Sequence, residues 1–200
     1  ASMKIGIFGG GQLGRMMALA AYPFNLGFSF YESAENCPSA PLGEVIGDKE
    51  ASKASLDAFL ASADVFTYEF ENIPVAWVEH IAQHKPVYPS VKSLAVSQNR
   101  LNEKQLFAKL GIPAAAYHEV RSQADLQQAV DSLGLPLVIK TTMGGYDGKG
   151  QFVIRQAEQV GQAWSELQGG APLIAEAFIR FERELSIIAV RAQDGETRCY

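Results

Sequence analysis

The chain has 200 residues, 48% of them hydrophobic, and its 17 basic and 22 acidic residues give a formal net charge of −5. This length and composition allow one large domain or two small ones, and the charge lacks the basic excess that marks nucleic-acid binding. With two cysteines and no long apolar run, the sequence predicts neither a disulfide framework nor a membrane-spanning helix, and we expect a cytoplasmic protein.

The first half of the sequence alternates short apolar runs with segments of helical periodicity, and glycine or proline turns lie between them. This alternation predicts a parallel sheet covered by helices on both faces. The expected strands are 4–8, 27–31, 43–48, 64–70 and 85–90, and the expected helices are the segment after the first glycines, 52–63 and 74–84.

A glycine motif follows the first predicted strand. Gly9, Gly11 and Gly14 have the spacing G-x-G-x-x-G, and Glu32 follows the second strand. In dinucleotide-binding folds such glycines form a tight strand-to-helix turn that binds phosphate, and the acid binds a ribose. Taken alone, the motif leaves an NAD(P)-dependent oxidoreductase open.

The second half predicts a different set of elements. A helix at 100–111 ends at Gly111, and a helix at 122–134 begins with a capping box between Ser122 and Asp125. The remaining expected elements are strands at 135–142, 150–155 and 172–179, a helix at 156–170, and a hairpin over 183–200 that turns at Asp194-Gly195.

The strand at 135–142 leads into a glycine-rich loop and carries Lys140 near its end. The glycines of the loop are Gly144, Gly145, Gly148 and Gly150. Backbone N–H groups in such a loop can approach a polyphosphate closely, and the lysine adds a positive charge. It is not a Walker A loop, because Lys149 is followed by glycine. A surface hairpin loop without function remains the alternative.

Two carboxylates flank the next turn. Glu176 ends one predicted strand and Glu184 begins the next. A strand in this position can offer backbone groups to a base edge, and a carboxylate can accept hydrogen bonds from ribose hydroxyls. Ordinary solvated turn charges at 182–184 are the alternative.

The order of these elements resembles the ATP-grasp superfamily. The motifs "TTMGGYDGKGQ", "EFENIP" and "GGGQLGRM" together are similar to those of the 5-(carboxyamino)imidazole ribonucleotide synthetases. The resemblance implies an α/β fold with a Rossmann-like domain at 3–97, the small lobe of an ATP-grasp fold with its flap at 98–180, and the start of the large lobe at 181–200. It also implies ATP-dependent carboxylation of aminoimidazole ribonucleotide by bicarbonate in purine biosynthesis, by a homodimer.

The resemblance also implies roles for individual residues. Arg100 and Lys140 contact the ATP phosphates, Glu176 to Ile179 hold adenine, and Glu184 binds the ribose. The ATP-binding residues are then Arg100, Lys140, Gly145, Tyr146, Asp147, Gly148, Lys149, Gly150, Gln151, Glu176, Ala177, Phe178, Ile179 and Glu184. The catalytic residues are Lys140, Tyr146 and Asp147, and the substrate-binding residues are Gly11, Gln12, Leu13, Glu71, Tyr146 and Asp147.

In this interpretation the first glycine turn binds the 5′-phosphate of the ribonucleotide, and Glu32 binds no adenosine ribose. Glu71 contacts the ribonucleotide, with a helix-start carboxylate as the alternative. Mg²⁺ is expected to accompany ATP, with ligands beyond residue 200. Because the sequence stops at "GETRCY", inside a predicted strand, we expect the polypeptide to continue.

Three other functions stay open. An NAD(P)-dependent oxidoreductase explains the first glycine motif but not "GGYDGKGQ". A formate-dependent glycinamide ribonucleotide transformylase is a second ATP-grasp ligase with a related N-terminal motif. A nucleotide sensor without turnover is the third.

Overall fold

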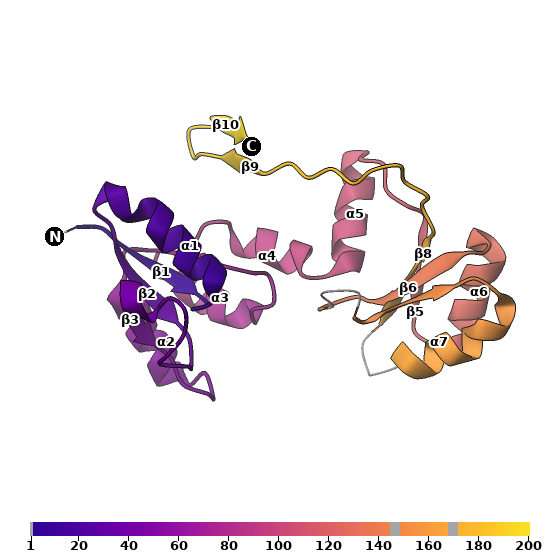
Figure 1. Ribbon diagram of the computed structural model, residues 1–200, viewed down its shortest axis with the longest axis horizontal. Helices are drawn as coiled ribbons and strands as arrows, with labels where there is room; N and C mark the ends of the chain where they lie inside the picture. Colours follow the sequence, from indigo (N-terminus) through magenta and orange to yellow (C-terminus); the bar gives the residue numbers. More distant parts are fainter. Residues whose placement is uncertain (1, 145–148, 168–171) are drawn as a thin grey trace.

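The computed structural model describes residues 2–144, 149–167 and 172–200. It has two sheet-containing halves, and Figure 1 shows the helices α4 (Val91–Ser97) and α5 (Arg100–Leu110) between them. None of the helices in these residues is long and apolar enough to cross a membrane.

The first half contains a four-stranded parallel sheet in the order β3-β2-β1-β4. Its elements are β1 (Lys4–Phe8), α1 (Gln12–Ala21), η1 (Tyr22–Phe24), β2 (Gly27–Tyr31), η2 (Ala40–Leu42), β3 (Glu44–Ile46), α2 (Lys53–Ser62), β4 (Val65–Tyr68) and α3 (Val75–Ala82). The predicted parallel sheet is confirmed. The segment 85–90 contributes only an isolated bridge between Phe66 and Val87, so it is shorter than predicted.

Side-chain alternation along β1 explains why helices cover both faces of this sheet. Ile7 faces a core with Ala18 of α1, whereas Phe8 faces a second core with Phe59 of α2 and Ile81 of α3. Successive residues of a strand point to opposite faces. Both faces are therefore buried, and the carboxyl ends of the strands are left to form a site.

The second half contains a four-stranded sheet in the order β5-β8-β6-β7, and all of its pairs are antiparallel. Its elements are β5 (Tyr117–Val120), α6 (Gln123–Leu133), β6 (Leu137–Thr141), β7 (Gln151–Ile154), η3 (Ala157–Gln159), α7 (Val160–Leu167) and β8 (Leu173–Ala177). The predicted capping box of Ser122 and Asp125 is present, and Gly111 ends α5 with a φ of 69°. The mixed α/β fold class is thus confirmed.

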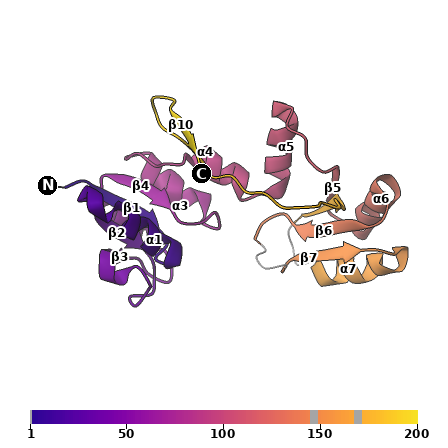
Figure 2. The same ribbon diagram turned by 45° about the horizontal axis from the view of Figure 1, so that its top comes forward.

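The residues after β8 form an exposed segment that ends in a small hairpin. The hairpin of β9 (Ala189–Arg191) and β10 (Thr197–Cys199) turns at Asp194-Gly195, as predicted. Figures 1 and 2 show the segment passing α5 towards the first half, where Gln193 donates a hydrogen bond to Tyr88. Residues 183–188 belong to no strand, so the prediction that Glu184 begins one is wrong. Ile188 exchanges backbone hydrogen bonds with Tyr200, but no strand among the described residues pairs with 183–187.

Candidate functional site

Lys140 and Glu176 meet on one face of the antiparallel sheet. In the register of β6 and β8, Glu176 lies opposite Val138, two residues before Lys140. The Lys140 Nζ atom lies 2.5 Å from Glu176 Oε2, and Lys104 of α5 places its Nζ atom 2.7 Å from Glu176 Oε1. Two lysines from two elements therefore bind the two oxygens of one carboxylate.

This lysine–glutamate cluster of Lys104, Lys140 and Glu176 is partly buried. Glu176 is 7% exposed and is the only buried charged residue in the part of the chain that the structure describes. Burial raises the pKa of its carboxyl, but the hydrogen bonds and charges of Lys104 and Lys140 outweigh burial and hold the pKa below its usual range. Because two lysines face one carboxylate, the formal charge of the cluster is positive, which suits a polyphosphate ligand.

Sequence reasoning named Lys140 and Glu176 but missed Lys104. A signal for it was present, because Lys104 lies four residues after Arg100 on a predicted helix. Residues spaced by four share a helix face. The same face of α5 thus presents both Arg100 and Lys104 to β6 and β8.

Arg100, the first residue of α5, binds the base of the glycine-rich loop. Its Nη1 atom donates to the carbonyl oxygens of Thr141 (3.0 Å) and Gly144 (2.8 Å). Its backbone N–H donates to the carbonyl oxygen of Thr142 at 2.9 Å. Arg100 therefore fastens the end of β6 to the start of α5, close to the strand that carries Lys140.

The glycine-rich loop itself is described only in part. The predicted residues Gly145, Tyr146, Asp147 and Gly148 lie outside the described residues. At the far side of the loop, Gln151 pairs with Lys140 in the β6–β7 register, and Lys149 is exposed.

Gly150 shows why a glycine is needed where the loop enters β7. Its φ is +71°, and a Cβ atom at this position would lie 2.8 Å from Thr141 Oγ1. The Gly150 carbonyl accepts a hydrogen bond from the Thr141 N–H at 2.8 Å. The ends of the loop are therefore held together directly beside Lys140.

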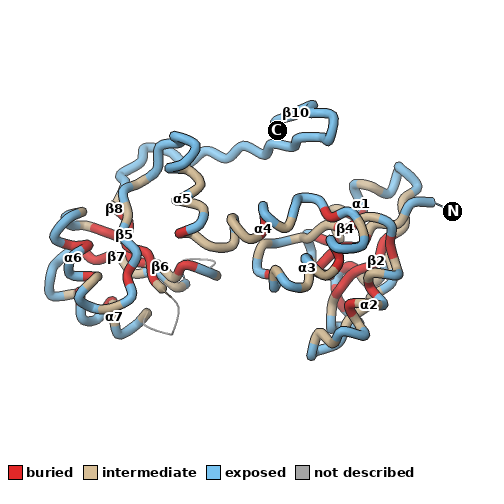
Figure 3. The backbone as a smooth tube through the Cα atoms, turned by 180° about the vertical axis from the view of Figure 1, so that it is seen from behind, coloured by how far each residue is buried: buried red, intermediate tan, exposed pale blue. Residues whose placement is uncertain are grey.

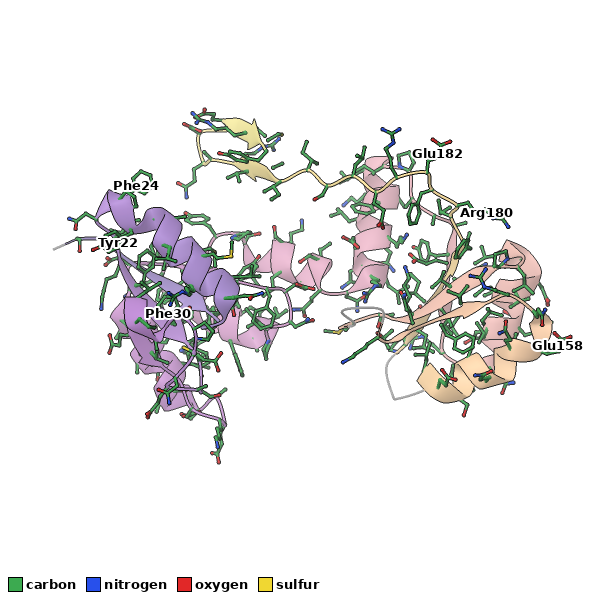
Figure 4. All side chains as sticks on the ribbon, in the orientation of Figure 1. Tyr22, Phe24, Phe30, Glu158, Arg180 and Glu182 are labelled. Carbon is green, nitrogen blue, oxygen red and sulfur yellow. The ribbon has the colours of Figure 1, made fainter. Side chains whose placement is uncertain are left out.

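The predicted adenine hinge continues β8 outward. The Ala177 N–H donates to the Ala116 carbonyl oxygen at 2.9 Å. The Cζ atom of Arg155 lies 5.6 Å from the centre of the Phe178 ring. Ile179 is 54% exposed. Glu184 lies on the exposed segment after β8, along which Figure 4 shows Arg180 and Glu182. The structure brings Glu176 to Lys140 but does not fold Glu184 onto them.

A second candidate region lies at the glycine turn between β1 and α1. Glu69, just after β4, accepts hydrogen bonds from the Gly11 N–H at 3.0 Å (Oε1) and the Gly14 N–H at 2.6 Å (Oε2). The Gly11 amide is therefore already bound within the protein, and a contact of Gly11 with the substrate stays a prediction. Gln12 and Leu13 are exposed and line a shallow cavity with Phe70.

Glu71 lies in the loop after β4, at the carboxyl end of the parallel sheet, where ligands collect in open α/β folds. Gln98 of the α4 terminus holds this loop, because its Nε2 atom donates to the carbonyl oxygens of Glu71 (3.0 Å) and Ile73 (3.1 Å). The helix α3 begins after this loop, and its first turn contains no acidic residue. Pro74 is the N-cap of α3.

Glu32 binds its own turn. Its Oε1 atom accepts from the backbone N–H groups of Ser33 (2.8 Å) and Ala34 (3.3 Å). The described residues contain no group of three histidine, cysteine, aspartate or glutamate side chains that could hold a metal ion.

Two family models match the chain. Residues 2–98 match the ribonucleotide synthetase preATP-grasp domain, and residues 105–200 match the ATP-grasp domain. Together they span both sheet-containing halves.

Named relatives and solved structures agree with these models. A curated N5-carboxyaminoimidazole ribonucleotide synthase from Pseudomonas aeruginosa is 46% identical over 99% of this chain and 55% of its own length. The synthetase from Thermus thermophilus has a TM-score of 0.89 and 39% identity, over 98% of this chain and 52% of its own. The enzyme from Aspergillus clavatus, in complex with ADP and 5-aminoimidazole ribonucleotide, has a TM-score of 0.87 and 28% identity. This match covers 100% of this chain and 52% of that enzyme's chain. The chain thus spans about half the length of the relatives it matches.

Proposed function

The chain belongs to the ATP-grasp family, with a ribonucleotide synthetase preATP-grasp domain in its first half, and from this premise we propose that it forms part of an ATP-dependent ligase. The proposed reaction is the carboxylation of 5-aminoimidazole ribonucleotide by bicarbonate. Its products are 5-(carboxyamino)imidazole ribonucleotide, ADP and phosphate. The named relatives support this assignment, including the one bound to ADP and 5-aminoimidazole ribonucleotide.

The lysine–glutamate cluster at the base of the glycine-rich loop is the observation that carries the proposal. Two lysines share one buried carboxylate there, so the site holds a net positive charge where a triphosphate would need it. Attack of bicarbonate on the γ-phosphoryl group needs neutralised charge and correct positioning more than covalent help. Lys140, Arg100 and the loop N–H groups are proposed to supply both.

The proposed chemistry has two steps. A bicarbonate oxygen attacks the γ-phosphorus and displaces ADP, which gives carboxyphosphate. The exocyclic amine of aminoimidazole ribonucleotide then attacks the carboxyl carbon, and phosphate and a proton leave. Because carboxyphosphate hydrolyses readily, a glycine loop that closes over the site and excludes water has a chemical purpose.

The ribonucleotide is proposed to bind at the carboxyl ends of β1 and β4. The amides of Gln12 and Leu13, at the start of α1, would bind its 5′-phosphate. Glu71, in the loop after β4, would contact the ribonucleotide from the neighbouring strand end. Tyr146 and Asp147 would face the imidazole, and Asp147 would orient or deprotonate the amine.

The adenine of ATP is proposed to bind at the end of β8. Backbone groups from Glu176 to Ile179 would hold the base, and Glu184 would reach the ribose once its segment folds against the nucleotide. We also propose domain limits at 3–97, 98–180 and 181–200, a homodimer, a cytoplasmic location, and Mg²⁺ bound to ATP through groups outside this chain.

The decisive experiment on the reaction is a substrate test with the intact protein. ATP hydrolysis that depends on bicarbonate and is stimulated by aminoimidazole ribonucleotide supports the proposal. Turnover that depends on formate and glycinamide ribonucleotide would instead assign the transformylase, and NAD binding without ATP binding would assign an oxidoreductase.

Lys140→Ala tests the phosphate contact in the same assay. A charge-assisted hydrogen bond contributes roughly 1.5–3 kcal/mol, so we expect kcat/KM for ATP to fall tenfold or more. Lys92→Ala, which changes an exposed lysine of α4, is the matched control and should keep the original value. An unchanged kcat/KM for Lys140→Ala would show that Lys140 does not contact the ATP phosphates.

A further inference from the structure

We propose that Glu69 is a positioning residue that acts as an internal anion in the glycine turn and leaves only the amides of Gln12 and Leu13 for a substrate phosphate. The inference rests on the proposed function for the identity of that phosphate. It concerns a carboxylate whose role neither the glycine motif nor the proposed contacts of Glu71 explain.

The contacts place the carboxylate inside the turn. The two oxygens of Glu69 accept separately from the N–H groups of Gly11 (3.0 Å) and Gly14 (2.6 Å). Gly11 is the N-cap of α1 and Gly14 lies in its first turn. A helix leaves its first N–H groups without intrahelical partners, and the helix dipole favours a negative charge at this end. Glu69 supplies that charge from within the protein.

The glycines of the motif make room for this side chain. A Cβ atom would lie 2.4 Å from Glu69 Oε1 at Gly9, 2.9 Å from Oε1 at Gly11 and 3.1 Å from Oε2 at Gly14. Real Cβ atoms do not approach an oxygen so closely at the first two positions, and the third is tight. The G-x-G-x-x-G spacing therefore fits a carboxylate that is already present, in the place where a dinucleotide-binding turn receives a pyrophosphate.

The strand order explains how Glu69 reaches the turn. β1 and β4 are parallel neighbours, with Phe8 opposite Tyr68, so the residue after Tyr68 lies beside the residue after Phe8. The Glu69 N–H also donates to the Phe8 carbonyl at 3.0 Å. The turn and the carboxylate are thus fixed to each other by the sheet.

A phosphate at this turn would have a limited set of donors. With the Gly11 and Gly14 amides bound to Glu69, the remaining donors of the first turn are Gln12 and Leu13. Both residues are exposed and line the cavity beside Phe70. A second anion placed among Gly11 and Gly14 would meet the carboxylate and be repelled. Two amides without a partner among the described residues suit one terminal phosphate, and Glu69 keeps the turn in the shape that presents them.

The experiment replaces Glu69 by alanine in the intact protein. We expect KM for aminoimidazole ribonucleotide to rise at least tenfold, while KM for ATP stays within twofold, because only the glycine turn is loosened. Acetate should enter the vacated space and bind the Gly11 and Gly14 amides. We therefore expect sodium acetate, compared with sodium chloride at equal ionic strength, to raise the Tm of Glu69→Ala and to lower its KM for the ribonucleotide.

Glu32→Ala is the matched control. Glu32 is a carboxylate after the adjacent strand β2, but its hydrogen bonds are to Ser33 and Ala34 of its own turn. This variant should keep the original KM values and show no response specific to acetate. If Glu69→Ala does not fold, Glu69→Gln takes its place. It has the same size and only one acceptor for two N–H groups, and it should raise KM for the ribonucleotide without a response to acetate.

The outcomes separate this inference from the proposed function. If the original protein shows no activity with aminoimidazole ribonucleotide, the proposed function fails, and the Tm response of Glu69→Ala to acetate still tests the role of Glu69. Equal KM values in the Glu69 variants and the original protein, or a Tm of Glu69→Ala that acetate does not change, would overturn the inference.

Discussion

At the scale of single residues, Glu176 shows how the site holds its charges. Its two oxygens bind Lys104 at 2.7 Å and Lys140 at 2.5 Å. A buried carboxylate that loses one partner depends fully on the other. Lys104 would therefore keep the buried carboxylate paired if Lys140 turned from Glu176 towards a phosphate, as the proposed function requires.

Lys104→Met should weaken ATP binding although Lys104 is only a positioning residue. Without Lys104, Glu176 retains Lys140 more strongly, and less of the Lys140 charge is free for ATP. We expect KM for ATP to rise about tenfold, the equivalent of about 1.4 kcal/mol, with kcat changed less. Steady-state kinetics with varied ATP measure both constants.

Two further variants sharpen this test. Lys104→Arg keeps the positive charge and should restore most of the ATP affinity, whereas Lys109→Met alters an exposed lysine of the same helix and should have no effect. A kcat that falls while KM for ATP stays constant would contradict the positioning role.

The residues of the candidate site differ in how far the sequence reveals them. Lys140 could be predicted because a strand and a glycine-rich loop flank it in the sequence. Lys104 and Glu69 could not be assigned in the same way. Lys104 binds a residue 72 positions later, and Glu69 binds Gly11 and Gly14 through the β1–β4 pairing. Strand order creates the Glu69 contacts, and the position of α5 beside β8 creates the Lys104 contact. Local sequence patterns contain neither kind of information.

At the scale of single elements, the start of α6 is fixed by side chains next to it. The Asp125 N–H donates to Ser122 Oγ at 3.1 Å, and Asp125 Oδ2 accepts from the N–H groups of Ser122 (2.9 Å) and Arg121 (2.8 Å). These backbone and side-chain hydrogen bonds hold the pKa of the Asp125 carboxyl below its usual value. This local pattern could be predicted from four residues.

Ser122→Ala should loosen the first turn of α6. Loss of an N-cap hydroxyl lowers the free energy of unfolding by about 1 kcal/mol, and we expect the amides of the first α6 turn to exchange hydrogen faster. Hydrogen exchange followed by mass spectrometry measures this change. Ser122→Asp, which keeps a capping oxygen, should preserve the protection. Unchanged exchange in Ser122→Ala would show that packing, not the cap, holds this helix end.

Other elements could not be predicted so well because they depend on distant partners. The strand expected at 85–90 is reduced to a bridge with Phe66, and 183–188 forms no strand. Pro86 and Pro89 interrupt the first stretch, because proline lacks the N–H that a strand ladder needs, whereas the second has suitable residue types. A strand also needs a neighbouring strand of matching length, and the sequence of the segment alone does not provide that information.

At the scale of the whole molecule, the hydrophobic core is divided. Figure 3 shows buried residues gathered in two separate halves, with an exposed segment after β8. The cores of the first half include Phe8, Phe30 and Phe59, and the core of the second half includes Leu126 and Ile139. No core cluster of the described residues draws from both halves. The two proposed binding regions therefore stand on separate bodies, which α4 and α5 connect.

Leu126→Ala tests whether these bodies are independently stable. Leu126 is fully buried in the second half, and removal of such a side chain lowers the free energy of unfolding by about 2–5 kcal/mol. We expect hydrogen exchange to accelerate in β5, β6 and β8, while β1, β2 and β4 keep their protection. Leu56→Ala, in the core of the first half, should give the reverse pattern. Equal loss of protection in both halves would show that the two bodies unfold as one cooperative unit. The glycine turn and the lysine–glutamate cluster would then have the same free energy of unfolding.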